Sequence, residues 1–146
     1  MAKIRKAKAT DLASLIELEN TLFHPPFSYE NLEKEVSDNE FSSVYVVEEG
    51  PIFLGFSILW ILFEQAQVVQ IGVDKAFQNR GYGKSLMKKM IDDAKKNGCE
   101  VMSLEVRVSN IPARSFYETF GFRQAALRRL YYRDPVEDGI LLWRAL

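Results

Sequence analysis

A glycine-rich hexapeptide joins a β-like run to a strongly periodic helix near the middle of this chain, with the sequence Gln78-Asn79-Arg80-Gly81-Tyr82-Gly83. Residues 68–73 are rich in β-branched side chains, which favours a strand. Residues 82–96 repeat their apolar members at helical spacing. A strand, a glycine turn and a helix N-terminus bring unpaired N–H groups and the positive end of a helix dipole to one point. The pattern predicts an anion site, for which phosphate is the natural ligand.

Composition limits the kinds of protein that this chain can be. With 146 residues, 47% of them hydrophobic, it has the size of one domain, residues 1–146. The 19 basic and 20 acidic residues give a net charge of -1, which argues against a nucleic-acid partner. Cys99 and His24 are single residues of their types, so we expect no disulfide and no metal. No signal-like or membrane-length apolar run is present, so we expect no membrane partner and a cytoplasmic location.

Strand-like and helix-like segments alternate along the chain. We expect strands at residues 3–7, 43–47, 52–63, 68–73, 101–108, 122–132 and 139–143, and an acidic loop at 134–138 between the last two. We expect four helices, which start at caps formed by Thr10 and Asp11, by Ser28, at Tyr82 and by Asn110. This order predicts an α/β fold with a mixed central sheet of about seven strands flanked by four helices.

The element order and several sequence blocks resemble the GCN5-related N-acetyltransferase (GNAT) superfamily over essentially the whole chain. The sharper matches are to RimI-type and archaeal peptide Nα-acetyltransferases. They comprise Leu104-Glu105-Val106-Arg107-Val108-Ser109-Asn110, Ala113 with Phe116-Tyr117-Glu118-Thr119-Phe120-Gly121-Phe122, Arg128-Arg129-Leu130-Tyr131-Tyr132 and Glu137-Asp138-Gly139. The resemblance implies a GNAT fold and acetyl-CoA-dependent transfer to the N-terminal α-amine of a protein or nascent peptide, a ribosomal protein being one candidate.

The hexapeptide then becomes the site for the pyrophosphate of acetyl-CoA, held over the backbone amides of residues 79–84. The resemblance also implies that Ile71, Gly72 and Val73 bind the pantetheine arm and polarise the thioester carbonyl, and that Asn110 contacts CoA as well as capping its helix. A plain helix-start turn and an ordinary buried strand are the alternatives. The predicted cofactor-binding residues are Ile71, Gly72, Val73, Gln78, Asn79, Arg80, Gly81, Tyr82, Gly83, Lys84 and Asn110.

Glu105 is the candidate general base. An α-amine with a pKa near 7.7 to 8.0 is largely protonated at neutral pH, so its attack on a thioester needs a proton acceptor, directly or through water. Glu105 interrupts the apolar run 101–108, where a lone carboxylate is costly unless it has a partner or faces a cleft. Strand alternation places it on one face with Ser103 and Arg107. A structural ion pair with Arg107 is the alternative.

Tyr117 is the candidate general acid, because it occupies the position that supplies a proton to the leaving thiolate in the resembled family. An aromatic residue at helical spacing beside Phe116 and Phe120 is otherwise usual for a core. Cys99 suggests a covalent acyl-enzyme, but no histidine lies near it in sequence, so an ordinary core or surface cysteine is expected. His24 is expected to be an ordinary loop histidine, with a substrate contact as the alternative.

The resemblance implies that the loops at 23–29 and 131–138 grip the acceptor peptide. The predicted substrate-binding residues are Phe27, Tyr29, Tyr131, Tyr132 and Glu137. The aromatic residues would form walls, and Glu137 with Asp138 would attract the amino group; packing aromatics and solvated acids are the alternative. Other functions compatible with the sequence are a GNAT enzyme for a small amine or a lysine side chain, a non-catalytic CoA-binding module, and a nucleotide-binding regulator.

Overall fold

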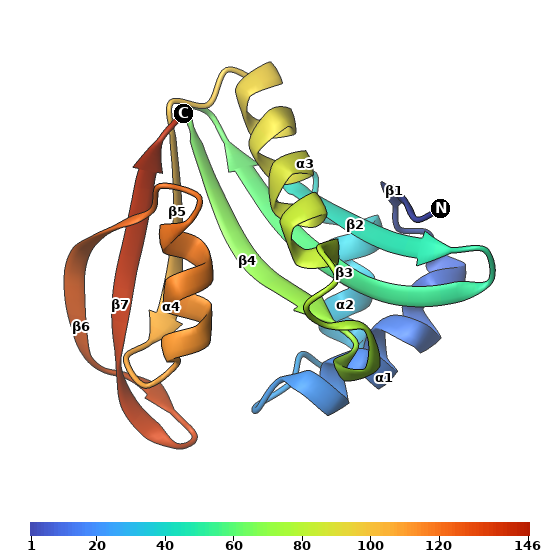
Figure 1. The fold of residues 1–146 in the computed structure, drawn as a ribbon, viewed down its shortest axis with the longest axis horizontal. Helices are drawn as coiled ribbons and strands as arrows, with labels where there is room; N and C mark the ends of the chain where they lie inside the picture. Colours follow the sequence, from blue (N-terminus) through green and yellow to red (C-terminus); the bar gives the residue numbers. More distant parts are fainter.

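One seven-stranded mixed sheet organises residues 1–146 in the computed structural model (Figure 1). The strands are β1 (Lys3–Lys6), β2 (Ser42–Glu49), β3 (Ile52–Leu62), β4 (Gln65–Val73), β5 (Val101–Arg107), β6 (Arg123–Arg133) and β7 (Val136–Ala145). The helices are α1 (Leu12–Leu22), α2 (Tyr29–Ser37), α3 (Tyr82–Lys96) and α4 (Ile111–Glu118), with short 3₁₀ turns at Ala9–Asp11 and Lys75–Phe77. The predicted fold class is confirmed. No helix combines the length and the apolar character needed to cross a membrane.

The two largest differences from the predicted boundaries lie in strands that were expected to be shorter. β4 begins at Gln65 because its first residues pair with both β3 and β5, and this pairing outweighs the weak strand preference of its glutamines. β7 begins at Val136, which pairs with Arg133, so the predicted acidic loop at 134–138 is wrong. Only Asp134 and Pro135 separate β6 from β7.

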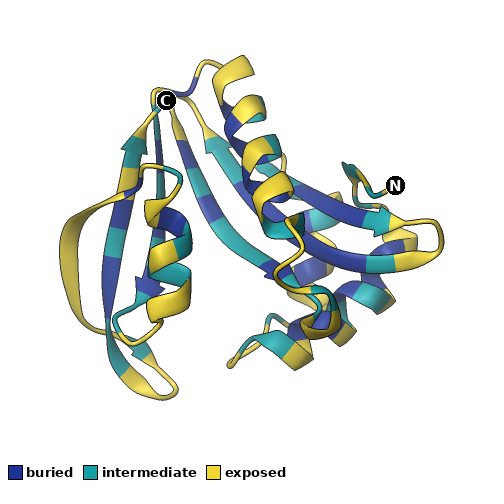
Figure 2. Cartoon of the chain, viewed as in Figure 1, coloured by how far each residue is buried: buried dark blue, intermediate teal, exposed yellow.

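Helices cover both faces of the sheet and create two hydrophobic clusters (Figures 1 and 2). α3 and α4 pack on one face, with Met87, Met90 and Tyr117 in the larger cluster. α1 and α2 pack on the other face, where Leu15 and Leu32 meet side chains of β2 and β3. β6 is one of the two edge strands of the sheet, and almost every residue along it is exposed (Figure 2).

The sheet opens between β4 and β5, its one parallel pair. These strands are paired only where Gln65–Gln67 meets Val101–Ser103. Beyond that point they diverge, so the sheet splits into two halves toward the carboxyl ends of both strands (Figure 1). Binding sites in α/β sheets are favoured at such carboxyl ends, because backbone groups there are left without a partner strand.

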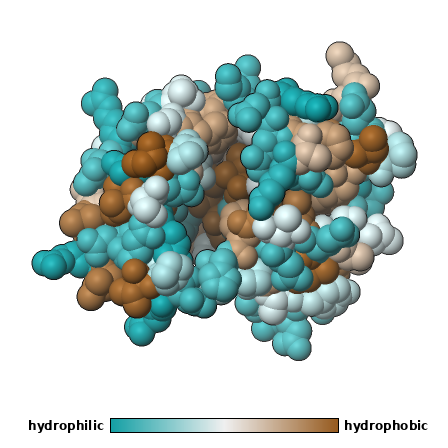
Figure 3. Space-filling view, turned by 60° about the horizontal axis from the view of Figure 1, so that its bottom comes forward, coloured by the Kyte–Doolittle hydropathy of each residue, from teal (hydrophilic) through white to brown (hydrophobic).

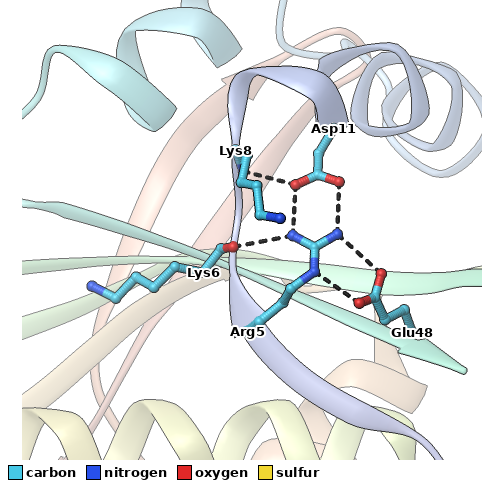
Figure 4. Close-up of polar contacts among 5 residues, drawn as sticks. All are labelled: Arg5, Lys6, Lys8, Asp11 and Glu48. Atoms are coloured by element: carbon cyan, nitrogen blue, oxygen red, sulfur yellow. Dashed lines mark hydrogen bonds and ion pairs between the residues drawn. The ribbon is translucent and has the colours of Figure 1, made fainter. Parts of the chain in front are cut away.

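Arg5 ties the first strand to the rest of the sheet (Figure 4). Its guanidinium donates two hydrogen bonds to Asp11, at 2.8 and 2.9 Å, and two to Glu48, at 2.8 and 3.0 Å. The Asp11 carboxylate also accepts from the backbone N–H of Lys8 at 2.7 Å. The sequence predicted that Asp11 would help to cap α1. Its side chain makes no cap hydrogen bond, because its oxygens bind Arg5 and Lys8 instead.

We expect the Arg5→Met substitution to lower the free energy of unfolding by about 2 kcal/mol, because it leaves the nearly buried Asp11 without its charged partner. Arg5 holds the pKa of Asp11 below its ordinary value through these hydrogen bonds. A lowered folded-state pKa stabilises the protein above the unfolded pKa of about 3.9, and this stabilisation is lost as the pH falls through the folded pKa. Urea unfolding should therefore show the full difference at neutral pH and a shrinking one below about pH 4.

The exposed Arg133, which makes no ion pair, provides the matched control. Arg133→Met should change the free energy of unfolding by no more than about 0.5 kcal/mol. Equal losses in the two variants at neutral pH would show that the Arg5 network is unimportant to the fold.

Candidate active site

A cavity of ≈ 480 Å³ occupies the space where β4 and β5 separate. The start of α3 and the face of α4 complete its walls. Its lining residues are Ile71, Gly72, Val73, Phe77, Gln78, Asn79, Gly81, Tyr82, Gly83, Lys84, Pro112, Ala113, Phe116 and Tyr117. A hollow with apolar atoms in its depth lies between the two halves of the molecule when the lower side is turned forward (Figure 3).

The glycine turn before α3 leaves a row of backbone donors free. Gly81 has a φ of +90°, a conformation that side chains disfavour, and it precedes the first helical residue. The first hydrogen bond of the helix runs from Ser85 N–H to Gly81 C=O at 3.0 Å. No N–H group of residues 79–84 has an acceptor within the chain. These free donors, together with the helix dipole, give the predicted anion site its physical basis.

The free edge of β4 faces the same cavity. Asp74 N–H donates to Leu54 C=O at 2.9 Å, and alternate residues of an antiparallel strand bond to the same neighbour. Gly72 and Asp74 therefore bond to β3, whereas Ile71 and Val73 turn their backbone groups toward the gap where β5 has separated. Gln78 Nε2 donates to Val73 C=O at 2.9 Å. The Ile71 and Val73 amides therefore remain available to a ligand.

Gly72 permits a close approach, but to α1. A Cβ at this position would lie 2.9 Å from Leu22 Cδ1 and 3.2 Å from Phe23 Cε2, so a larger residue would push against the side chains of Leu22 and Phe23. The irregularity in the β3–β4 ladder falls at Val69, opposite Ile58 and Leu59, and not at the glycine. The sequence did not indicate these contacts of Gly72, although Phe23 begins the loop at 23–29 that was expected to grip the peptide.

All predicted cofactor-binding residues except Arg80 and Asn110 line the cavity. The Arg80 guanidinium lies over the Phe77 ring, 5.6 Å from its centroid. Asn110 Oδ1 accepts from Ala113 N–H at 3.3 Å, which confirms its role as a helix cap and does not test a CoA contact. The lining residues that sequence reasoning missed are Phe77, Pro112, Ala113 and Phe116. Two of these residues could have been found from the sequence, because Phe77 directly precedes the predicted Gln78 and Phe116 directly precedes the predicted Tyr117.

Glu105 projects from the middle of β5, on the face opposite the core. Burial alternates along this strand, with Met102, Leu104 and Val106 inside, as the pattern predicted. The Glu105 side chain is 16% exposed, and Arg128 Nε lies 2.9 Å from its Oε2. Burial raises the pKa of Glu105, and the positive charge of Arg128 opposes that rise. A partly buried carboxyl group with a raised pKa has the character of a general base.

Arg107 is not the partner of Glu105, so the alternative reading of a Glu105–Arg107 pair is wrong. Its guanidinium donates to Pro135 C=O at 2.8 Å and to Asp134 C=O at 3.0 Å, lies 3.4 Å from Glu137 Oε1, and stacks 4.3 Å from the Tyr132 centroid. These contacts fix the β6–β7 turn against the end of β5.

Glu137 has a structural position in this arrangement. Its Oε2 accepts from Ser109 N–H at 2.7 Å, and this contact, with that of Arg107, lowers the pKa of its carboxyl. Each Glu137 oxygen already has a partner in the chain, so a substrate amine would share an oxygen with Ser109 or Arg107. Asp138 has one oxygen engaged, because its Oδ1 accepts from Leu130 N–H at 2.7 Å.

Tyr117 lies on the inner face of α4 and lines the cavity. Its ring packs edge-on against Phe116 at 5.5 Å and Phe122 at 5.9 Å, and only 9% of the residue is exposed. Burial raises the pKa of its phenol, which keeps the group protonated at neutral pH. The hydroxyl has no partner in the chain and is not among the polar atoms sealed from solvent. It is therefore free to bond to a ligand in the cavity.

The predicted substrate-binding residues separate into two groups. Tyr131 and Tyr132 form an edge-on pair at 5.0 Å on β6, close to Arg107 and Glu137. Phe27 instead lines a different cavity, of ≈ 520 Å³, between α2 and Trp60. Tyr29 is exposed at the start of α2.

His24 connects the two loops that were expected to grip the peptide. Its Nε2 lies 3.3 Å from Asp134 Oδ2, so the loop after α1 contacts the β6–β7 turn. Cys99 is buried, and its Sγ donates to Phe63 C=O at 3.6 Å. Burial raises the pKa of the thiol, which leaves less of the reactive thiolate at neutral pH, as expected for a core cysteine without a catalytic role.

Comparisons with known proteins agree with this geometry. The model of the acetyltransferase (GNAT) family matches residues 11–122. The Escherichia coli ribosomal protein bS18-alanine N-acetyltransferase is 31% identical over 147 residues, which cover 97% of this chain and 96% of that protein. The crystal structure of the E. coli ribosomal-protein-S18-alanine N-acetyltransferase has a TM-score of 0.89 at 30% identity, with 99% of this chain and 94% of that chain covered.

A more distant relative shows the same fold with a ligand. A GNAT family acetyltransferase from Elizabethkingia anophelis, solved with acetyl-CoA bound, has a TM-score of 0.80 at 22% identity, and 99% of this chain and 98% of that chain are covered. In this chain the corresponding architecture contains the open β4 edge, the free amides before α3 and the partly buried Glu105.

Proposed function

Because the chain belongs to the acetyltransferase (GNAT) family, we propose that it transfers the acetyl group of acetyl-CoA to the N-terminal α-amine of a protein or nascent peptide, within a ternary complex. The observation that carries this proposal is the opening between β4 and β5. It has free phosphate-binding amides at one side and, on β5, a carboxylate with a raised pKa. Similarity to the E. coli alanine N-acetyltransferase supports an α-amine as the acceptor.

The donor would be held by backbone groups. The N–H groups of residues 79–84 and the dipole of α3 suit the pyrophosphate of acetyl-CoA, with Lys84 adding a positive charge at the cavity wall. The free N–H groups of Ile71 and Val73 suit the pantetheine amides and the thioester carbonyl. A donor N–H aimed at that oxygen stabilises the charge that develops on it as the amine attacks.

Two side chains would handle the protons. The neutral amine attacks the thioester carbonyl carbon, so that a C–N bond forms and the C–S bond breaks. Glu105 accepts the proton released by the nitrogen, directly or through water, and the Tyr117 hydroxyl donates one to the departing CoA sulfur. Solvent then returns a proton to Tyr117 and removes one from Glu105, which restores both groups.

We place the acceptor on the face of the sheet that carries Glu105, bordered by Tyr131 and Tyr132. A ribosomal protein that begins with alanine is the first target to test, since the similar E. coli protein is named for that acceptor. We also propose a cytoplasmic location, which the lone buried Cys99, without a disulfide partner, supports.

A peptide panel tests this proposal. We expect acetyl-CoA-dependent acetylation of peptides with a free N-terminal alanine, detected by mass spectrometry as one acetyl group on the first residue. The same peptides with a blocked N-terminus and an internal lysine serve as matched controls, together with polyamines and aminoglycosides. Acetylation of the blocked peptides or of small amines at comparable rates would support the alternative acceptors. Tight CoA binding without transfer to any amine would support a binding module.

A further inference from the structure

We propose that Arg128 is a positioning residue for Glu105: it keeps the carboxylate ionised and holds one of its oxygens while the other stays open to the acceptor. This proposal rests on the proposed function for the role of Glu105 as base. Nothing in the resemblance or in the comparisons assigns such a role to Arg128. The contacts around β5, β6 and β7 carry it.

Arg128 reaches Glu105 across the intervening strand. On β7, Leu141 pairs with Glu105 and Gly139 pairs with Arg128, so the two charged residues lie on the same face, diagonally across the sheet. Arg128 Nε lies 2.9 Å from Glu105 Oε2. Gly139 leaves room on this face for the tyrosine pair, because a Cβ there would lie 3.0 Å from Tyr132 Cε2 and 3.2 Å from Tyr131 Cδ2. The Tyr131 ring lies 5.9 Å from the Arg128 guanidinium.

The two Glu105 oxygens are in different environments. Oε2 is sealed from solvent and makes no aligned hydrogen bond, so Arg128 holds it mainly through charge. Oε1 has no partner in the chain and is not among the sealed polar atoms. One oxygen is thus tethered beneath Arg128, and the other remains able to accept a proton.

Arg128 is the only cation within ion-pair distance of Glu105. Arg107, on the same face, is engaged by Glu137 and by two backbone carbonyls. Tyr132 also faces Glu105, and burial raises its pKa to about 12, so it is neutral at physiological pH. Tyr117 from α4 is likewise neutral, since burial raises the pKa of its phenol. Without Arg128, burial alone would therefore determine the ionisation of the base.

An irregularity in β6 directly follows Arg128. The strand leaves regular pairing between Arg128 and Tyr132, where Leu130 adopts a φ of +51° that is unfavourable for a leucine. Asp138 Oδ1 accepts from Leu130 N–H and holds this bulge. Strained bulges tend to occur where a strand must aim particular side chains. Here the bulge separates Arg128, directed at Glu105, from the tyrosine pair.

The test compares Arg128→Gln with Arg128→Lys and with Arg129→Gln, which removes the same charge from an exposed neighbour that makes no ion pair. The first readout is the pKa of Glu105 in the protein without substrates, from ¹³C NMR of glutamate carboxyl groups, with the signal assigned by its absence in Glu105→Gln. We expect Arg128→Gln to raise this pKa by at least about one unit, because a nearby opposite charge lowers a carboxyl pKa by about 1–3 units. Arg128→Lys should restore most of the shift, and Arg129→Gln should leave the pKa unchanged.

The second readout is the pH dependence of kcat with one peptide, so that the amine pKa is common to all variants. Arg128→Gln should move the acid limb upward with the carboxyl pKa and should approach the wild-type plateau at high pH. An unchanged carboxyl pKa, or a rate lowered by the same factor at every pH, would overturn the proposal. Because the NMR titration needs no turnover, an absence of α-amine acetylation would count against the proposed function, while the titration would still decide whether Arg128 controls Glu105.

Discussion

Replacing Glu105 with glutamine is expected to lower kcat for peptide acetylation by about 10²- to 10⁴-fold, the usual contribution of a general base. Glutamine keeps the size of the side chain and its place on β5 but cannot accept a proton from the amine. The proposed acetyl-CoA site is the cavity lined by β4, α3 and α4, which does not include Glu105, so the KM for acetyl-CoA should stay within about twofold. Steady-state CoA release, followed with a thiol reagent, measures both values.

The pH profile distinguishes lost chemistry from lost structure. Wild-type kcat should fall at low pH as Glu105 becomes protonated, and the variant should lose that component of the acid limb. Glu118→Gln, on the exposed side of α4, removes the same charge and should retain wild-type kinetics. If Glu105→Gln kept the wild-type rate over the whole pH range, the assignment of the base would be wrong.

Local patterns in the sequence were sufficient to place α3 and the free amides that precede it. The apolar repeat from Leu86 to Ala94, the Gly81 turn and the Asn97-Gly98 stop depend on interactions within a few residues, and the structure has the helix at the predicted residues. The strand alternation of β5 likewise placed Glu105 on the face opposite the core. Both features follow from backbone geometry, which a sequence pattern reflects directly.

Partners in the site depend on strand order and register, which no local pattern specifies. For Glu105, an ion pair with Arg107 on the same strand was the structural alternative to a role as base. The structure instead pairs it with Arg128, because β7 lies between β5 and β6 and the register brings Arg128 within reach. Arg107 is drawn to Glu137 and the β6–β7 turn by the same arrangement. The extent of the β4–β5 opening is also a tertiary property, because it depends on where the parallel pairing ends.

Loop aromatics were the least predictable part of the site. Phe27 and Tyr131 were both expected to form aromatic walls of the peptide site. Phe27 instead packs toward α2 and Trp60. Its direction follows from Glu19, a buried residue of α1 whose Oε1 accepts from Phe27 N–H at 2.9 Å and from Gln70 Nε2 at 2.7 Å. Burial raises the pKa of Glu19, and nothing in the sequence around it distinguished this glutamate from the exposed ones.

Tyr117→Phe is expected to lower kcat by about 10²-fold, the lower end of the contribution of a general acid, because the CoA sulfur must then leave without a proton from the enzyme. The effect should appear in single-turnover rates with both substrates bound, where binding and product release do not contribute. Since burial keeps the phenol protonated at neutral pH, the loss should be uniform across that range. Its pH dependence thus differs from that of the Glu105 variant.

Packing and chemistry can be separated cleanly at Tyr117, because its hydroxyl has no hydrogen-bond partner in the chain. Phenylalanine preserves the edge-on contacts with Phe116 and Phe122, so the free energy of unfolding should change by less than about 1 kcal/mol. A core role alone would therefore predict an active, stable variant, whereas the proposed mechanism predicts a stable variant with a slow chemical step. Wild-type single-turnover rates in Tyr117→Phe would assign the proton to another donor, and a large loss of stability would show that the hydroxyl is bonded in the folded protein.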